Sequence, residues 1–131
     1  MKISCHGLEC DIRPSLPDSE GWMHTAVVVK VPNFEGSFSC TVEIEEWKAF
    51  VRLLQQLESS IGSDVQLSWE NMEENIRLAF SLKKAGGIKG SYKFSSDNFS
   101  LGPLLSGQFT ADQSFLRQWV QSASDSTKHA R

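Results

Sequence analysis

The chain has 131 residues, 40% of them hydrophobic and 22% charged, with a formal net charge of −3. This length predicts one domain that buries a core without metals or disulfides, and the acidic balance argues against a general nucleic-acid binder, which needs a basic surface. The absence of an apolar run of about 18 residues argues against a membrane span. Three cysteines, an odd number, and a start without an apolar signal segment predict a cytoplasmic location.

The first third of the chain predicts β-strands. Apolar residues alternate along residues 3–12 with a change of parity at Gly7, which predicts a bulge or turn at this glycine. The nearly continuous apolar run 22–31 suits a central strand, and residues 33–36 are the expected hairpin connection. The alternation around Phe38, Cys40 and Val42 then predicts a half-buried strand.

The period of the apolar pattern changes to that of a helix after residue 44. Glu45 and Glu46 lie in its expected first turn, where carboxylates favour the helix dipole, and Gly62 follows as a C-terminal stop. The expected apolar face consists of Trp47, Phe50, Val51, Leu54, Leu57 and Ile61.

Three further alternating segments predict strands at residues 65–69, 76–83 and 88–94, with a glycine turn between the last two. A shorter strand around residues 105–109 leads to a second amphipathic helix, for which Thr110 and Gln113 have the spacing of a capping box. The domain is expected to cover residues 1–124, and residues 125–131 are expected to form a frayed C-terminal tail.

These elements predict an α+β fold: an antiparallel sheet of about six to seven strands with two amphipathic helices packed on one face. The other face is expected to be polar and open, which suits a docking surface. Its expected residues are Ser37, Ser39, Thr41, Arg77, Ser81, Lys89, Ser91 and Lys93.

The residues that could support catalysis or bind metal are explained by ordinary structural roles. Cys5, His6, Cys10 and Cys40 lack the spacing of a zinc site, so the cysteines are expected to be buried thiols. A cysteine nucleophile would need a base; His24 could approach a cysteine, but His129 lies in the expected tail. Gly86, Gly87 and Gly90 lack the Walker lysine and read as hairpin glycines. We therefore expect no catalytic residues, no metal and no cofactor.

Charged residues give two candidate binding surfaces. Basic residues form a stripe, but Phe80, Tyr92 and Phe94 share the parity of the core, so the stripe lacks exposed stacking aromatics and disfavours RNA; the stripe is Arg77, Lys83, Lys84, Lys89 and Lys93. Acidic residues at element ends are the expected contacts for a basic protein partner: Glu45, Glu46, Glu70, Glu73 and Glu74. This second expectation rests on charge alone.

One family resemblance covers most of the chain. The segment Phe109–Leu116, with Asp112-Gln113-Ser114-Phe115-Leu116, resembles the closing helix start of the WapI-like immunity proteins of bacterial polymorphic toxin systems. Earlier residues agree with that pattern: the strand 7–12, Trp22, the strand at Gly36-Ser37-Phe38, Phe50, Leu54, Gly62 and the segment 107–109. The resemblance implies a non-enzymatic protein that neutralises a cognate toxin by tight binding, and it transfers no binding residue.

Two alternatives remain open from the residues themselves. One is a small enzyme or ligand-binding α+β domain, whose site would combine scattered residues such as His24, Cys40 or paired glutamates in a deep pocket. The other is a nucleic-acid adaptor that uses the basic stripe. The oligomeric state and the identity of the partner do not follow from the sequence.

Overall fold

The structure is a computed structural model, which describes residues 1–127 and contains two four-stranded antiparallel sheets and two helices in that part of the chain. Sheet A has the order β1-β2-β3-β4, with β1 Lys2–Cys5, β2 Leu8–Pro14, β3 Trp22–Val31 and β4 Phe34–Glu43. Sheet B has the order β5-β6-β7-β8, with β5 Val65–Glu70, β6 Ile76–Leu82, β7 Gly87–Ser95 and β8 Leu104–Asp112. Helix α1 is Ile44–Ser59, and α2 is Leu116–Thr127.

The predicted α+β class is confirmed, with eight strands in two sheets in place of six to seven strands in one. Helix α1 lies between β4 and β5 in the chain, and every strand forms its ladder only with neighbours on its own side of that helix, apart from the isolated bridge between His6 and Thr110. Each half is therefore a meander of sequential antiparallel strands, because short turns favour pairing with the next strand.

The strand boundaries follow the alternation, apart from the β3–β4 turn and the end of β8. Gly7 has a φ of 94° and forms the turn between β1 and β2, as its parity change predicts. The β3–β4 hairpin turns at Pro32 and Asn33, where Asn33 has a φ of 72°. The expected hairpin connection at 33–36 is therefore wrong beyond its first residue, since Phe34, Glu35 and Gly36 all pair with β3. Asn tolerates the left-handed conformation, so the turn can be this short.

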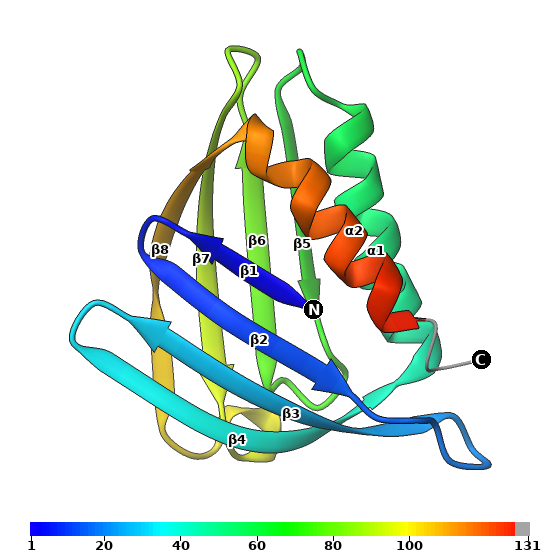
Figure 1. Ribbon diagram of the computed structural model, residues 1–131. Coiled ribbons are helices and arrows are strands. Elements are labelled where there is room, and N and C mark those ends of the chain that lie inside the picture. The colour runs from blue at the N-terminus through cyan, green and yellow to red at the C-terminus, as the bar shows by residue number, and fades with distance from the viewer. Residues whose placement is uncertain (128–131) are drawn as a thin grey trace.

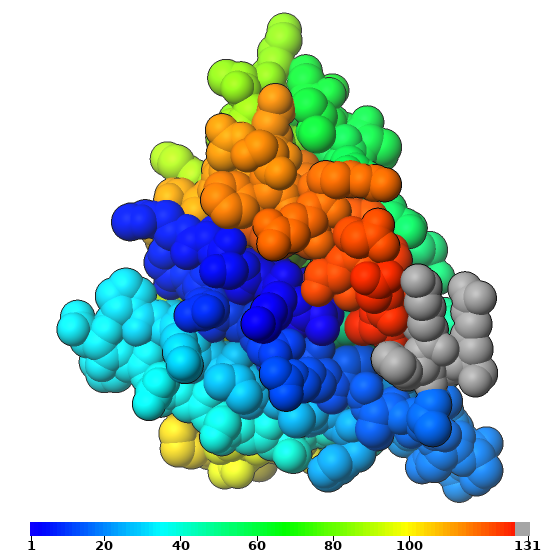
Figure 2. Space-filling model, in the orientation of Figure 1, coloured from blue at the N-terminus to red at the C-terminus, as the bar shows by residue number. Residues whose placement is uncertain are grey.

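The core lies between sheet A, sheet B and the helices. Figure 1 shows sheet A crossing in front of sheet B at a steep angle, with α1 and α2 side by side over the same face of sheet B. In that orientation the side chains of sheet A and α2 form a closed surface over most of this face (Figure 2). Trp47, Phe50 and Trp119 are almost completely buried beneath it.

Helix α1 follows the predicted period closely. Its first five predicted apolar residues are buried, but Ile61 lies past the last helical residue and is 44% exposed. Glu43 caps the helix in a reciprocal capping box with Glu46. Neither helix of the described residues is long and apolar enough to cross a membrane.

The start of α2 differs from the predicted capping box. Thr110 belongs to β8 and pairs with Lys89, while Asp112 caps the short 3-10 helix Gln113–Phe115 that precedes α2: its side chain accepts from the Ser114 backbone N–H at 2.8 Å. The Gln113 N–H donates to the Gly86 carbonyl. A capping box at Thr110 is wrong because β8 extends three residues further than its apolar pattern suggests. Helix α2 continues to Thr127, and residues 128–131 of the expected tail lie outside the described residues.

Candidate functional site: an open groove on sheet B

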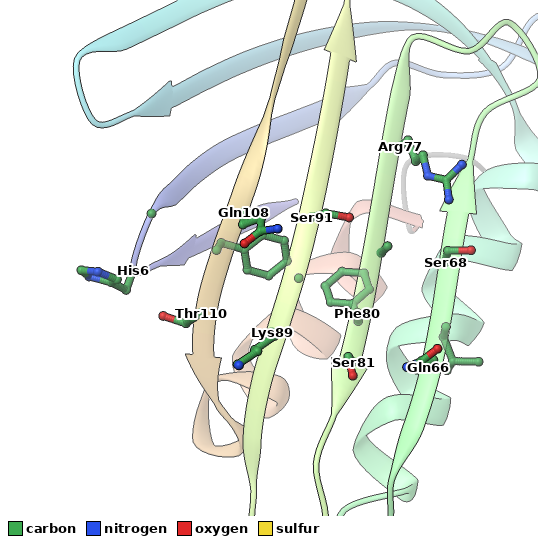
Figure 3. A pocket seen from close by; sticks show the side chains of 15 residues that line it. His6, Gln66, Ser68, Arg77, Phe80, Ser81, Lys89, Ser91, Gln108 and Thr110 are labelled. Carbon is green, nitrogen blue, oxygen red and sulfur yellow. The ribbon is translucent and has the colours of Figure 1, made fainter.

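An open groove of about 850 Å³ lies on the face of sheet B that the helices and sheet A leave uncovered. Figure 3 shows side chains from β5, β6, β7 and β8 projecting into it, with His6 beyond the β8 edge. His6 reaches this place because its carbonyl accepts from the Thr110 N–H at 3.0 Å. The β1–β2 turn of sheet A thereby extends the groove past the edge of sheet B.

The groove is hollow because three of the four side chains in its middle row are short. Strand register places Ser68, Ala79, Ser91 and Gln108 in one row across the sheet. One flanking row consists of Gln66, Ser81, Lys89 and Thr110, and the other of Glu70, Arg77, Lys93 and Ser106, so each flanking row includes long side chains. Three small residues lie in register between two rows that include long side chains, and this arrangement leaves a trough. The sequence of a single strand does not reveal it.

The charge of the groove is opposite to that of the chain. Its lining includes Arg77 and Lys89 and no Asp or Glu. Within residues 1–127 neither cation forms an ion pair, whereas Lys93 on the flanking row pairs with Glu70 at 3.6 Å. The groove therefore carries two positive charges without an ion pair within residues 1–127, in a protein whose net charge is −3.

The floor of the groove consists of strand backbone, with buried aromatic rings beneath it on the core side of the sheet. The ring of Phe109 lies over Gly90 on the core side, where a Cβ would stand 2.0 Å from it, and Tyr92 covers Gly107 in the same way. Phe80 and Phe109 are each 2% exposed. The open face thus has the predicted combination of charge without stacking aromatics.

The predicted polar face is divided between the two sheets. Ser37, Ser39 and Thr41 lie on the outer face of sheet A, in β4, whereas the five remaining predicted residues lie on the outer face of sheet B. Five polar groove residues were not anticipated: His6, Gln66, Ser68, Gln108 and Thr110. Their alternation predicts exposure, but only strand register places them around one hollow.

The predicted acidic contacts have different surroundings at the start of α1. Glu46 is half-buried, and its carboxylate accepts from the backbone N–H of Glu43 at 2.9 Å and of Met72 at 2.6 Å. Glu45 is exposed and pairs with Lys48 at 3.6 Å. Glu46 is thus committed to joining α1 to the β5–β6 turn, while Glu45 is accessible.

The other three glutamates flank the β5–β6 turn. Glu70 is half-buried beside Lys93, and Glu74 adopts a φ of 61° within the turn. The carbonyl of Glu73 accepts from the Phe99 N–H, and that of Glu74 from the Ser100 hydroxyl. The contact between Glu46 and Met72 therefore brings the start of α1 and this turn to one corner of the molecule.

The cysteines are poor nucleophiles in this fold. Burial raises the pKa of Cys5 to about 11, and those of Cys10 and Cys40 to about 12. His24 projects from the outer face of sheet A, while Cys10 and Cys40 project from the inner face, so His24 does not approach either thiol. Across residues 1–127 no three His, Cys, Asp or Glu side chains gather as metal ligands would; His129 lies outside this range.

Fold and site together define a two-sheet α+β protein with one closed, helix-covered face and one open, concave sheet face. The chain belongs to the immunity protein WapI-like family, whose family model matches residues 1–129. This match confirms the resemblance carried by the segment Phe109–Leu116. No curated protein matches the chain.

Solved structures with a related arrangement are distant in sequence. WHY3 from Arabidopsis thaliana is 11% identical with a TM-score of 0.45, over 98% of this chain and 86% of that one. The plant transcriptional regulator PBF-2 is 7% identical with a TM-score of 0.47, over 98% of this chain and 80% of that one.

Proposed function

We propose that this chain is an immunity protein that neutralises a cognate bacterial toxin by direct protein–protein binding in the cytoplasm, without catalysis. The observation that carries the proposal is the family match over residues 1–129. The open groove on sheet B, together with the exposed Glu45 and the half-buried glutamates around the β5–β6 turn, supplies surfaces on which a protein partner can dock. Buried thiols with raised pKa values support a binding role over a cysteine-based reaction.

The proposal predicts that a toxin is encoded beside this chain's gene and that the chain protects cells from it. The test is to produce that toxin domain in a bacterial host with and without this chain, and to follow growth. We expect growth only when both are produced, and we expect the purified pair to migrate together on gel filtration. Continued growth arrest in the presence of well-folded chain would contradict the proposal.

We call the glutamates at the start of α1 and around the β5–β6 turn the acidic corner, and we propose that it contacts basic residues of the toxin. These glutamates are Glu45, Glu46, Glu70, Glu73 and Glu74. Because Glu46 supports the fold, the test reverses the four other glutamates, as Glu45→Lys, Glu70→Lys, Glu73→Lys and Glu74→Lys together. Complementary charges at a rim mainly speed association and make it sensitive to salt. We expect slower association and a weaker salt dependence in the variant, measured by surface plasmon resonance. Unchanged kinetics would remove the acidic corner from the interface.

A further inference from the structure

The groove on sheet B is wide enough to hold one helix or one extended segment of another protein. Arg77 and Lys89 lie on opposite sides of the small middle row (Figure 3). Lys89 pairs with Ser81, which lies four positions along β6 from Arg77, so the two flanking rows are roughly 13 Å apart at the usual rise of a strand. A single helix or an extended chain fits between rows at this separation, since a helix with its side chains is about 10 to 12 Å wide.

The positive charges of the groove favour a negatively charged partner. Both cations lack an ion-pair partner within residues 1–127, and no carboxylate lines the trough. A cationic partner would meet two like charges there, whereas an anionic partner would supply the missing counter-charges. Electrostatic complementarity of this kind governs which partners can approach a surface.

The neutral residues of the groove favour a polypeptide over a nucleic acid. Ser68, Ser91 and Gln108 offer hydroxyl and amide groups that can donate to and accept from a peptide backbone. Bases would need exposed aromatic rings on which to stack, and the rings beneath this floor are buried.

We infer that the groove on sheet B receives an acidic segment of the toxin, whose carboxylates pair with Arg77 on one side and Lys89 on the other. The inference rests on the proposed function and names the surface and the chemistry of the partner. It is distinct from the acidic corner, which would contact basic residues elsewhere on the toxin.

The first test uses defined probes in place of the toxin. The ¹⁵N-labelled chain is titrated at low ionic strength with a peptide of alternating glutamate and serine, with the same peptide carrying lysine, and with oligouridine. We expect the acidic peptide to shift the amide signals of Ser68, Ser91 and Gln108, and the lysine peptide to leave them unchanged. Shifts confined to other surfaces, or stronger binding of oligouridine at these residues, would overturn the inference.

Two variants of the groove separate charge from shape. Arg77→Glu with Lys89→Glu reverses both cations, and Ser91→Trp fills the middle of the trough without a change of charge. The matched control is Arg52→Glu with Lys30→Glu, since both residues are exposed and form no ion pair in the described part of the chain. We expect each groove variant to weaken toxin binding by about tenfold or more, and the control by less than about threefold.

The toxin experiment distinguishes the two proposals. If the wild-type chain fails to neutralise the toxin, the proposed function fails. If the wild-type chain neutralises it and both groove variants, shown to be folded by circular dichroism, do so equally well, the inference fails while the proposed function stands. Loss of protection in both groove variants with retention in the control supports both.

Discussion

Two buried tryptophans differ in whether their indole N–H is paired. Trp69 donates from Nε1 to the carbonyl of Glu46 at 2.8 Å, which links β5 to α1. Trp119 is 1% exposed, and its Nε1 has no hydrogen-bond partner within residues 1–127. An unpaired buried donor costs about 1–3 kcal/mol. The indole N–H of Trp69 therefore stabilises the fold, whereas the indole N–H of Trp119 destabilises it.

Replacing each tryptophan by phenylalanine tests this difference. Trp69→Phe removes a hydrogen bond, while Trp119→Phe removes an unpaired donor, and both lose comparable packing. We expect the free energy of unfolding to fall by about 1–3 kcal/mol more for Trp69→Phe than for Trp119→Phe. Urea unfolding followed by circular dichroism measures both. Equal losses would mean that the Trp119 donor is satisfied in solution.

At the scale of single elements, sheet B depends on glycines covered by aromatic rings. A Cβ at Gly90 would stand 2.0 Å from Phe109, whereas at Gly87, in the same strand, it would meet nothing within 4 Å. Both glycines have backbone conformations open to other residues, because neither has a positive φ. The difference between the two positions is therefore steric.

Alanine at each position separates the two effects. Gly90→Ala is expected to lower the free energy of unfolding by about 1–3 kcal/mol through overpacking, while Gly87→Ala changes it by less than about 0.5 kcal/mol, as surface substitutions usually do. Thermal and urea unfolding give both values. Adding Phe109→Leu to Gly90→Ala should recover part of the loss, and no recovery would point to another cause.

The start of α1 gives a second element-scale prediction. Glu46→Ala leaves the N–H groups of Glu43 and Met72 without their acceptor, so the free energy of unfolding should fall by about 1–3 kcal/mol. Glu45→Ala removes only an exposed ion pair with Lys48 and should cost less than about 1 kcal/mol. Similar losses in urea unfolding would contradict a structural role specific to Glu46.

At the scale of the whole molecule, the two sheets share one core. Buried residues of sheet A, sheet B and both helices form a single cluster, and one backbone hydrogen bond, from the Thr110 N–H to the His6 carbonyl, joins the β1–β2 turn to β8. A domain of this size with one core is expected to unfold in a single transition.

Tryptophan positions allow that cooperativity to be measured. Trp22 is the only tryptophan in sheet A, whereas Trp47, Trp69 and Trp119 lie in α1, β5 and α2. We expect the fluorescence of a variant that keeps Trp22 alone to change at the same urea concentration as the far-ultraviolet circular dichroism of that variant. An earlier fluorescence transition would show that sheet A unfolds separately.

The sequence predicts most elements because burial repeats along each of them. The nearly continuous apolar run identifies β3 and alternation identifies β6, each nearly residue for residue, and the period of α1 identifies its buried face. Where side chains did not reflect burial, prediction failed: Thr110 reads as a helix cap, yet it is an exposed residue of β8. Asp112, two residues later, performs the capping.

The candidate site was predicted in part. The sequence singled out Arg77, Ser81, Lys89 and Ser91 as exposed on one sheet face, and they line the groove. The hollow itself was not foreseen, since it depends on Ser68, Ala79 and Ser91 standing in register on three strands.

The sequence alone determined the α+β class, the positive charge on one strand face and the burial of Cys10 and Cys40, because each of these follows from local pattern and residue type. Only the tertiary structure decided that the strands form two sheets and that small residues align into a trough. The physical reason is that alternation records that one face of a strand is buried but not what buries it. Strand register and sheet packing are contacts between residues far apart in the chain, and these contacts made the open face of sheet B a groove.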